Sequence, residues 1–128
     1  MTDRIQAVQQ VYAAFAEGDV ARLQELLAET HWVEAAGMPY GGTYRGFGEV
    51  AANVFGPIAV DVQGFLAKPD EVIAAGDDRV LALGTYRGRG SAGDLASPFA
   101  HLWTVRDGHI TNFVQYADTH LFRRALGG

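Results

Sequence analysis

The chain has 128 residues, of which 48% are hydrophobic and 20% charged, a composition typical of one soluble globular domain spanning residues 1–128. Its formal charge of −5 and the lack of any Lys or Arg run argue against a nucleic-acid or anionic-membrane partner. The absence of cysteine excludes disulfides, thiolate catalysis and Cys-based zinc sites. Since we find neither a membrane-length apolar run nor a signal-peptide core, we expect a cytoplasmic protein.

The N-terminal part of the sequence carries helical patterns. Apolar residues recur every three and four positions over residues 3–17, which predicts an amphipathic helix that ends at Gly18. Asp19 is a suitable N-cap for a second helix over residues 20–29. The elements expected next are a strand over 31–37, a glycine-rich turn over 38–46 and a short helix over 47–55.

Beyond Pro57 the sequence becomes rich in β-branched and aromatic residues, and turn signals such as KPD, GDD and RDG divide it. Helices followed by a series of antiparallel strands predict an α+β fold. The expected strands cover 59–67, 71–76, 79–88, 97–105 and 109–118, and a last short helix covers 119–126.

The last two expected strands are joined by Asp107-Gly108, a common two-residue hairpin turn. A β-bulge after this turn would reverse the faces of the second strand, turning Gln115 toward His101 and Asp118 away. Without a bulge, alternation of side chains places ionisable groups and aromatic rings on one face, as expected of a cavity wall. That face would carry Phe99, His101, Trp103, Val105, Ile110, Asn112, Val114, Tyr116 and Asp118.

The segments VQQVYAAFAEGDVARLQELLAE and HLWTVRDGHITNFVQYADT, with PYGGTYRG between them, resemble SnoaL-like polyketide cyclases, ketosteroid isomerases and nuclear transport factor-like proteins. The resemblance covers nearly the whole chain. It implies a cone-shaped fold in which N-terminal helices pack on a strongly curved antiparallel sheet and enclose a pocket. It also implies a homodimer through the outer sheet face, where we expect Leu102 and Phe113. The superfamily includes isomerases, cyclases, hydrolases, dehydratases and binding proteins, so the fold alone does not choose among them.

The resemblance aligns the functional positions of these families only approximately. SnoaL-like cyclases have an acid–base aspartate in the last strand where this chain has Gln115, and its own Asp118 comes three residues later. Ketosteroid isomerases have a carboxylate base just before the glycine-rich turn, where Glu34 is the nearest match. Tyr12 is adjacent to the position of their oxyanion-hole tyrosine, and His101 is near that of their buried acid.

The leading hypothesis is a cofactor-independent enzyme that acts on a small hydrophobic metabolite bearing a carbonyl group. Asp118 or Glu34, its pKa raised by burial, would remove a proton next to the carbonyl. His101, with Tyr116 or Tyr12, would hydrogen-bond the developing enolate oxygen, which permits isomerisation, cyclisation or dehydration. The residues expected to bind the substrate are Tyr12, Trp32, Tyr40, Phe99, Trp103 and Gln115.

Each candidate also has a purely structural interpretation. His101 could be a core histidine bonded to a backbone carbonyl, Asp118 the N-cap of the last helix, and Glu34 an exposed edge-strand carboxylate. No pair of histidines stands at a ligand spacing with a carboxylate, so we expect no metal site. A ligand-binding or accessory protein without catalysis, and a purely structural dimer, are the alternative functions.

Overall fold

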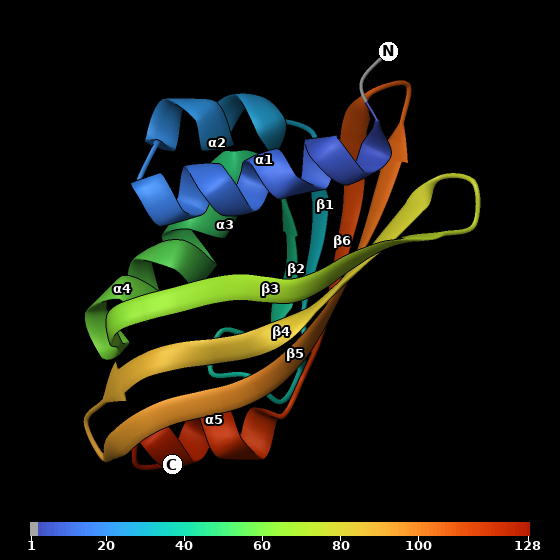
Figure 1. Ribbon diagram of the computed structural model, residues 1–128. Helices are drawn as coiled ribbons and strands as arrows, with labels where there is room; N and C mark the ends of the chain where they lie inside the picture. Colours follow the sequence, from blue (N-terminus) through green and yellow to red (C-terminus); the bar gives the residue numbers. More distant parts are fainter. Residues whose placement is uncertain (1–2) are drawn as a thin grey trace.

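A computed structural model describes residues 3–128 and shows one curled six-stranded sheet with helices packed against it (Figure 1). The strand order is β2-β1-β6-β5-β4-β3, in which β1 and β6 are parallel and all other neighbours are antiparallel. The predicted α+β fold is therefore confirmed. The strands are β1 (His31–Glu34), β2 (Gly42–Arg45), β3 (Gln63–Ala75), β4 (Arg79–Gly90), β5 (Gly93–Arg106) and β6 (His109–Ala117).

The helices precede the long strands, except for one at the C-terminus. Within residues 3–128, no helix is both long and apolar enough to cross a membrane. The helices are α1 (Arg4–Glu17), α2 (Val20–Leu26), α3 (Gly46–Val50), the π-helical turn η1 (Ala51–Phe55), α4 (Gly56–Asp61) and α5 (Thr119–Ala125).

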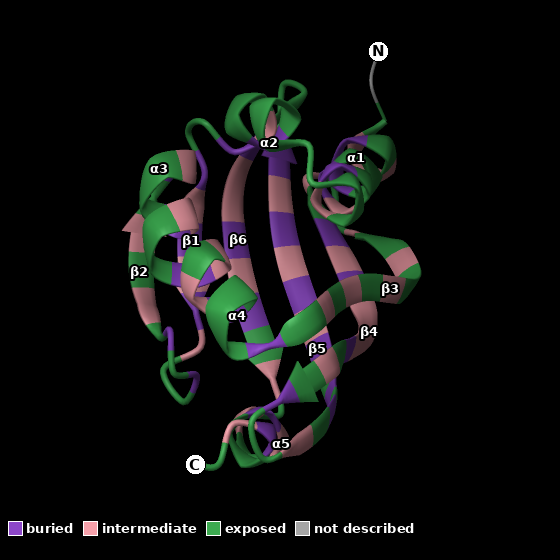
Figure 2. Ribbon diagram, turned by 90° about the vertical axis from the view of Figure 1, so that its left-hand side faces the viewer, coloured by how far each residue is buried: buried purple, intermediate pink, exposed green. Residues whose placement is uncertain are grey.

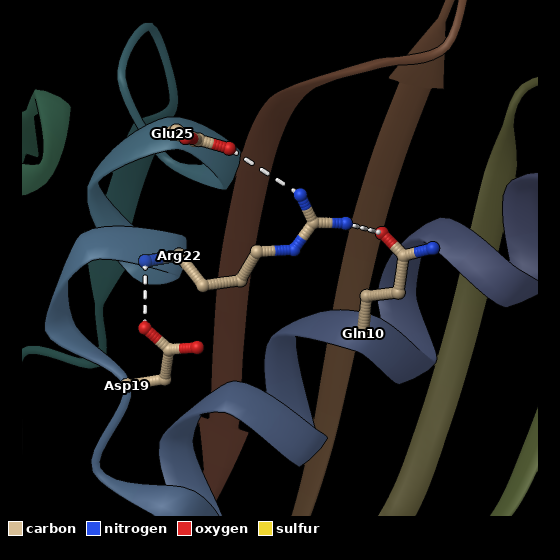
Figure 3. A network of polar contacts seen from close by, with 4 residues as sticks. All are labelled: Gln10, Asp19, Arg22 and Glu25. Carbon is tan, nitrogen blue, oxygen red and sulfur yellow. Dashed lines mark hydrogen bonds and ion pairs between the residues drawn. The ribbon is translucent and has the colours of Figure 1, made fainter.

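The junction between α1 and α2 follows the predicted capping pattern. Gly18 adopts a left-handed conformation with φ of 68° and ends α1, because glycine has no Cβ to oppose it. The Asp19 carboxylate accepts from the backbone N–H of Arg22 at 3.1 Å and caps α2. The Arg22 guanidinium donates to Gln10 of α1 at 2.7 Å, which ties the two helices together, and it also pairs with Glu25 of its own helix at 3.3 Å (Figure 3).

The core lies between α1 and the sheet, and several aromatic rings pack against one another among its aliphatic side chains. Trp103 and Phe113 are both 1% exposed, and their ring centroids lie 4.6 Å apart. Trp32 stacks on Phe113 at 3.7 Å, so β1, β5 and β6 meet in one packed layer. Buried residues alternate along these strands in Figure 2 because successive side chains of a strand point to opposite faces.

Two predicted elements are wrong around Pro57. The first three residues of the expected strand 59–67 belong to helix α4, which Pro57 favours because proline fits the first turn of a helix. The expected turn at Lys68-Pro69-Asp70 lies inside β3, where the pairing register with β4 shifts between Pro69 and Glu71. A proline is tolerated there since β3 is an edge strand and its pairing is irregular at this point.

The glycine-rich turn expected over 38–46 contains a short strand. Residues Gly42–Arg45 form β2, which pairs antiparallel with β1 and becomes the second edge of the sheet. This pairing moves β1 from the edge to an interior position between β2 and β6. Its inward-facing side chains, Trp32 and Glu34, are buried as a result.

The β5–β6 hairpin turns at Asp107-Gly108, as predicted, and both residues have positive φ (52° and 77°). Val105 pairs with Ile110, but Thr104 already pairs with Asn112. Thr111 is therefore the extra residue of a β-bulge.

The bulge reverses the faces of β6 beyond Thr111. Phe113 and Gln115 point into the core and are 1% and 4% exposed, whereas Tyr116 is 57% exposed on the outer face. The face assignment for a regular hairpin is wrong for this strand, and the bulged alternative is correct. The expectation that Phe113 lies on the outer face is wrong for the same reason.

Candidate active site

A cavity of about 50 Å³ lies between α1, η1, α4 and the concave face of the sheet. Its wall is mostly apolar, with a few convergent polar groups, which is the usual composition of a small-molecule site. The lining residues are Val11, Tyr12, Phe15, Trp32, Glu34, Val54, Phe55, Ile58, Phe65, Ala67, Tyr86, His101, Trp103, Phe113 and Gln115.

His101 projects from β5 into this cavity between two tyrosine hydroxyl groups. The Tyr12 oxygen lies 2.6 Å from its Nδ1, and the Tyr86 oxygen lies 2.5 Å from its Nε2. Phe99 stacks on the imidazole at 4.1 Å and holds its plane. Burial lowers the pKa of His101 to about 3, so the ring is neutral at physiological pH. Its partners are side chains, not the backbone carbonyl of the structural interpretation.

Further donors fix both tyrosines. The indole N–H of Trp103 donates to the Tyr12 oxygen at 3.0 Å, and the Gln115 amide donates to the Tyr86 oxygen at 2.8 Å. The backbone N–H of Ala35 donates to the Gln115 carbonyl oxygen at 2.9 Å, which sets the orientation of that amide. Burial raises the pKa of Tyr12 and of Tyr86 above the ordinary tyrosine value, so both remain protonated.

Glu34 lies on the same cavity wall and is only 2% exposed. Its Oε1 accepts from the Trp32 indole at 2.9 Å, whereas Oε2 is buried and has no hydrogen-bond partner among residues 3–128. Burial raises the pKa of Glu34 to about 7, opposed in part by the Trp32 indole and the neighbouring Gln115 amide. The exposed-carboxylate interpretation is wrong. Glu34 has the proton affinity that a general base needs near neutral pH.

Two of the predicted catalytic residues do not reach the cavity. Tyr116 points to the outer face of the sheet. Asp118 caps α5, its carboxylate accepting from the backbone N–H of Leu121 at 2.9 Å, so the capping interpretation is correct. The expectation that both line the pocket is wrong because the bulge at Thr111 shifts the strand by one residue.

Two predicted substrate-binding residues also lie outside the cavity wall. Tyr40 donates to the Asp61 carboxylate at 2.9 Å and packs edge-on against Phe122, which joins the loop after β1 to α4 and α5. Phe99 lies behind the His101 ring and supports it. Tyr12, Trp32, Trp103 and Gln115 do line the cavity, as expected.

Tyr86 is the functional candidate that sequence reasoning missed. It alternates in β4 with Val80 and Ala82, both 0% exposed, so its side chain points inward. This alternation was the available signal, because a tyrosine in phase with buried aliphatic residues brings its hydroxyl group into the core.

A second hollow, of about 620 Å³, lies outside the cavity between α1 and β3. Four side chains line both spaces, namely those of Tyr12, Phe15, Phe65 and Ala67. The rings of Phe15 and Phe65 meet edge-on at 6.0 Å, so this pair forms part of the wall between the cavity and the second hollow, which we call the groove.

Across the described residues, no group of three or more His, Asp or Glu side chains is arranged to hold a metal ion.

The geometry can be compared with known proteins. A model of the SnoaL-like domain family matches residues 8–113. The chain therefore belongs to the SnoaL-like domain family. A search among curated proteins finds no match.

Solved structures agree with this assignment. An NTF2-like protein from Burkholderia thailandensis is 35% identical over 98% of both chains, with a TM-score of 0.91. TerC, co-crystallized with polyporic acid, is 28% identical over 98% of both chains, with a TM-score of 0.86. A hypothetical protein of ketosteroid isomerase-like fold from Catenulispora acidiphila shares the fold at 22% identity, over 86% of this chain and 83% of that one, with a TM-score of 0.71. The predicted family resemblance is confirmed.

The burial of Glu34 predicts a pH-dependent stability that Glu34→Gln removes. Because folding raises the pKa of this carboxyl from 4.5 to about 7, the folded state loses stability as pH rises through that window. The free energy of unfolding of the variant, measured relative to that of wild type, should therefore rise by about 3 kcal/mol between a pH below 4.5 and a pH above 7. The protonation of His101 in the unfolded state acts equally on both proteins and cancels. Denaturant titrations at several pH values measure this difference.

Glu29→Gln is the matched control, because Glu29 is exposed on the loop before β1. It removes a glutamate carboxyl that lies in solvent, and so shows the effect of the substitution without burial. A pH-independent difference for Glu34→Gln would show that the Glu34 carboxyl ionises normally in the folded protein.

Proposed function

We propose that the protein is a cofactor-independent acid–base enzyme that enolises a small hydrophobic metabolite next to its carbonyl group. The observation that carries this proposal is the Glu34 carboxyl, which has one unpartnered buried oxygen and lines a cavity that also holds tyrosine hydroxyl groups. An isomerase, cyclase or dehydratase reaction can proceed from the enolate. The superfamily that the sequence resembles includes proteins of each type, so the fold supports this class without selecting one reaction.

The proposed reaction begins when Glu34 Oε2 takes a proton from the carbon next to the carbonyl. The electron pair of that C–H bond forms the C=C bond of the enolate, and the carbonyl oxygen becomes negative. Oε1 stays bonded to the Trp32 indole, which holds the carboxylate while Oε2 reacts. A base whose pKa is about 7 is about half ionised at neutral pH and still strong enough to take the proton.

Tyr12 is the proposed donor to the enolate oxygen. Its hydroxyl group lines the cavity and is held by Trp103 and His101, so little reorganisation is needed when the negative charge forms. Preorganised donors in a water-poor site stabilise a developing oxyanion strongly. The neutral His101 ring supports the hydroxyl group without adding a positive charge to the cavity.

The substrate needs more room than the cavity of about 50 Å³ offers. We therefore place the carbonyl end in the cavity and the remaining apolar part in the groove between α1 and β3, which adjoins it. The similar protein TerC, crystallised with polyporic acid, supports the binding of a small organic molecule by this fold. Without catalysis, the same pocket would make the chain a ligand-binding or accessory protein.

Exchange of the α-hydrogens of 2-tetralone, a bicyclic ketone, for deuterium tests the function by proton NMR in D2O. Wild type should accelerate exchange, with a rate that rises with pH and levels off above about 7 as Glu34 ionises. Glu34→Gln should lose about 100-fold or more of the rate, and Tyr12→Phe roughly 10- to 1,000-fold.

Asp118→Asn and Tyr116→Phe are the controls, since neither side chain reaches the cavity and Asn also caps helices well. Both should retain the wild-type rate. Saturable binding of 2-tetralone without faster exchange would contradict the enzymatic proposal and leave the ligand-binding alternative.

We also propose that the protein forms a homodimer through the outer face of the sheet. An apolar row crosses five strands of that face, because cross-strand partners in β3, β4, β5, β6 and β1 are all aliphatic. The row consists of Ile73, Leu81, Leu102, Val114 and Val33, with the exposed ring of Tyr116 beside it. A contiguous apolar surface of this kind is rare on monomers, and a second copy would cover it.

Light scattering during size-exclusion chromatography tests the dimer. Wild type should elute with twice the mass of the chain at micromolar concentration, and Leu102→Lys should shift the protein to the monomer because it buries a charge in the interface. Gln24→Lys, on the exposed side of α2, should leave the dimer intact. A monomeric wild type would refute this assembly.

A further inference from the structure

The amide of Gln115 can only donate toward Tyr86. The backbone N–H of Ala35 donates to the Gln115 carbonyl oxygen at 2.9 Å, and a backbone N–H cannot act as an acceptor. The amide nitrogen of Gln115 therefore faces Tyr86 and donates to its oxygen at 2.8 Å. It follows that Gln115 offers no acceptor to the hydroxyl proton of Tyr86.

The hydrogen bonds of Tyr12 are constrained in the same way. The indole N–H of Trp103 can only donate, and it lies 3.0 Å from the Tyr12 oxygen. His101 joins the two tyrosines, with Nδ1 2.6 Å from the Tyr12 oxygen and Nε2 2.5 Å from the Tyr86 oxygen. Burial keeps the pKa of His101 at about 3, so the ring is neutral and has one N–H and one acceptor nitrogen. It can accept the hydroxyl proton of only one tyrosine.

The position of the remaining hydroxyl proton decides between the two tautomers of His101. If Nε2 carries the ring proton, the hydroxyl proton of Tyr86 has no acceptor among residues 3–128, and Tyr86 is only 5% exposed. If Nδ1 carries it, the remaining proton belongs to Tyr12, which is half-buried and lines both the cavity and the groove. Water or a ligand can accept that proton. A buried donor without a partner therefore disfavours the Nε2–H tautomer by on the order of 10-fold.

We infer that His101 carries its proton on Nδ1 and that Tyr12 directs its own hydroxyl proton into the cavity. Gln115 and Tyr86 hold this arrangement, because Gln115 donates to Tyr86 and Tyr86 then donates to Nε2. The inference rests on the proposed role of Tyr12 as the donor to the enolate oxygen. It adds Gln115 and Tyr86 as positioning residues that act through His101.

The direction of these hydrogen bonds determines what Tyr12 can do. With the proton on Nδ1, the Tyr12 oxygen accepts from His101 and from Trp103, and its own proton is available to a ligand. Hydrogen bonds arranged in series in this way strengthen one another. With the opposite direction, Tyr12 would have to break its bond to Nδ1 before it could donate. The arrangement therefore suits a ligand oxygen that accepts, such as that of a ketone or an enolate.

Nitrogen NMR of protein labelled with ¹⁵N-histidine tests the inference without substrate, because protonated and unprotonated ring nitrogens give separate signals. Substitution of the other histidines assigns their signals and leaves that of His101; these are His31, His109 and His120. Wild type should carry the ring proton of His101 on Nδ1. A ring proton on Nε2 would overturn the inference.

Tyr86→Phe tests the positioning role. It removes the donor to Nε2, so His101 should populate both tautomers, and kcat for 2-tetralone exchange should fall roughly 3- to 30-fold at an unchanged KM. In a Tyr12→Phe background the same substitution should cause no further loss, because Tyr86 acts through the Tyr12 hydroxyl group. Tyr44→Phe is the control, since its hydroxyl group bonds the Tyr40 carbonyl outside the cavity. It should change neither the tautomer nor the rate.

Equal losses from Tyr86→Phe in both backgrounds would contradict the positioning role. The tautomer and the exchange rate also separate this inference from the proposed function. If wild type carried the proton on Nε2 while exchange still depended on Glu34 and Tyr12, the function would stand and the inference would fail. An Nδ1–H tautomer without any exchange would support the arrangement and reject the function.

Discussion

The site depends on the burial of the Glu34 carboxyl group with one oxygen unpartnered. Removing a carboxylate from water costs several kcal/mol unless donors replace the lost hydration, and among residues 3–128 only the Trp32 indole is within hydrogen-bonding distance of the group. The fold tolerates the buried carboxyl group because burial raises its pKa to about 7, so that the group keeps its proton and stays neutral below that pH. The surrounding polar groups leave one oxygen of the carboxyl group unbonded among the described residues.

The β-sheet makes this burial possible through two irregularities. Strand β2 covers the edge of β1, so that Glu34 faces the core of the cone and not bulk water. The bulge at Thr111 turns Gln115 inward, where its amide links Tyr86 to the backbone of Ala35. A regular hairpin would have placed Val114 at that position, which could not bond either group. The polar groups that line the cavity therefore depend on two separate segments of the chain, strand β2 and the bulge at Thr111.

Much of the architecture was predictable from local patterns. The caps at Gly18 and Asp19, the Asp107-Gly108 turn and the family segments at both ends led to the correct fold. The choice between a regular and a bulged β6 stayed open at the level of sequence, since a bulge depends on packing against β5 and on no single residue type. Asp118 was ambiguous for a related reason, because a carboxylate at a strand end caps a helix as readily as it binds a ligand.

Some residues of the site were predictable from the sequence and one was not. His101, Tyr12 and Glu34 were identified from residue type and from the family resemblance, and the structure brings all three to one cavity. Tyr86 was missed because nothing in its neighbourhood distinguishes an inward tyrosine that packs from one that bonds a histidine 15 positions away. Contacts of this kind arise only when distant strands are aligned, here through the pairing of Ala82 with His101 across β4 and β5.

The central claim is that Glu34 is buried as a carboxyl group that exchanges its proton near neutral pH. Carbon NMR of protein labelled at the glutamate carboxyl carbons measures this directly, with Glu34→Gln identifying the signal. A titration midpoint for Glu34 at about pH 7 is the result that the structure predicts. A midpoint near the ordinary glutamate value of about 4.3 would contradict it, because the group would then be solvated and the cavity would contain no base.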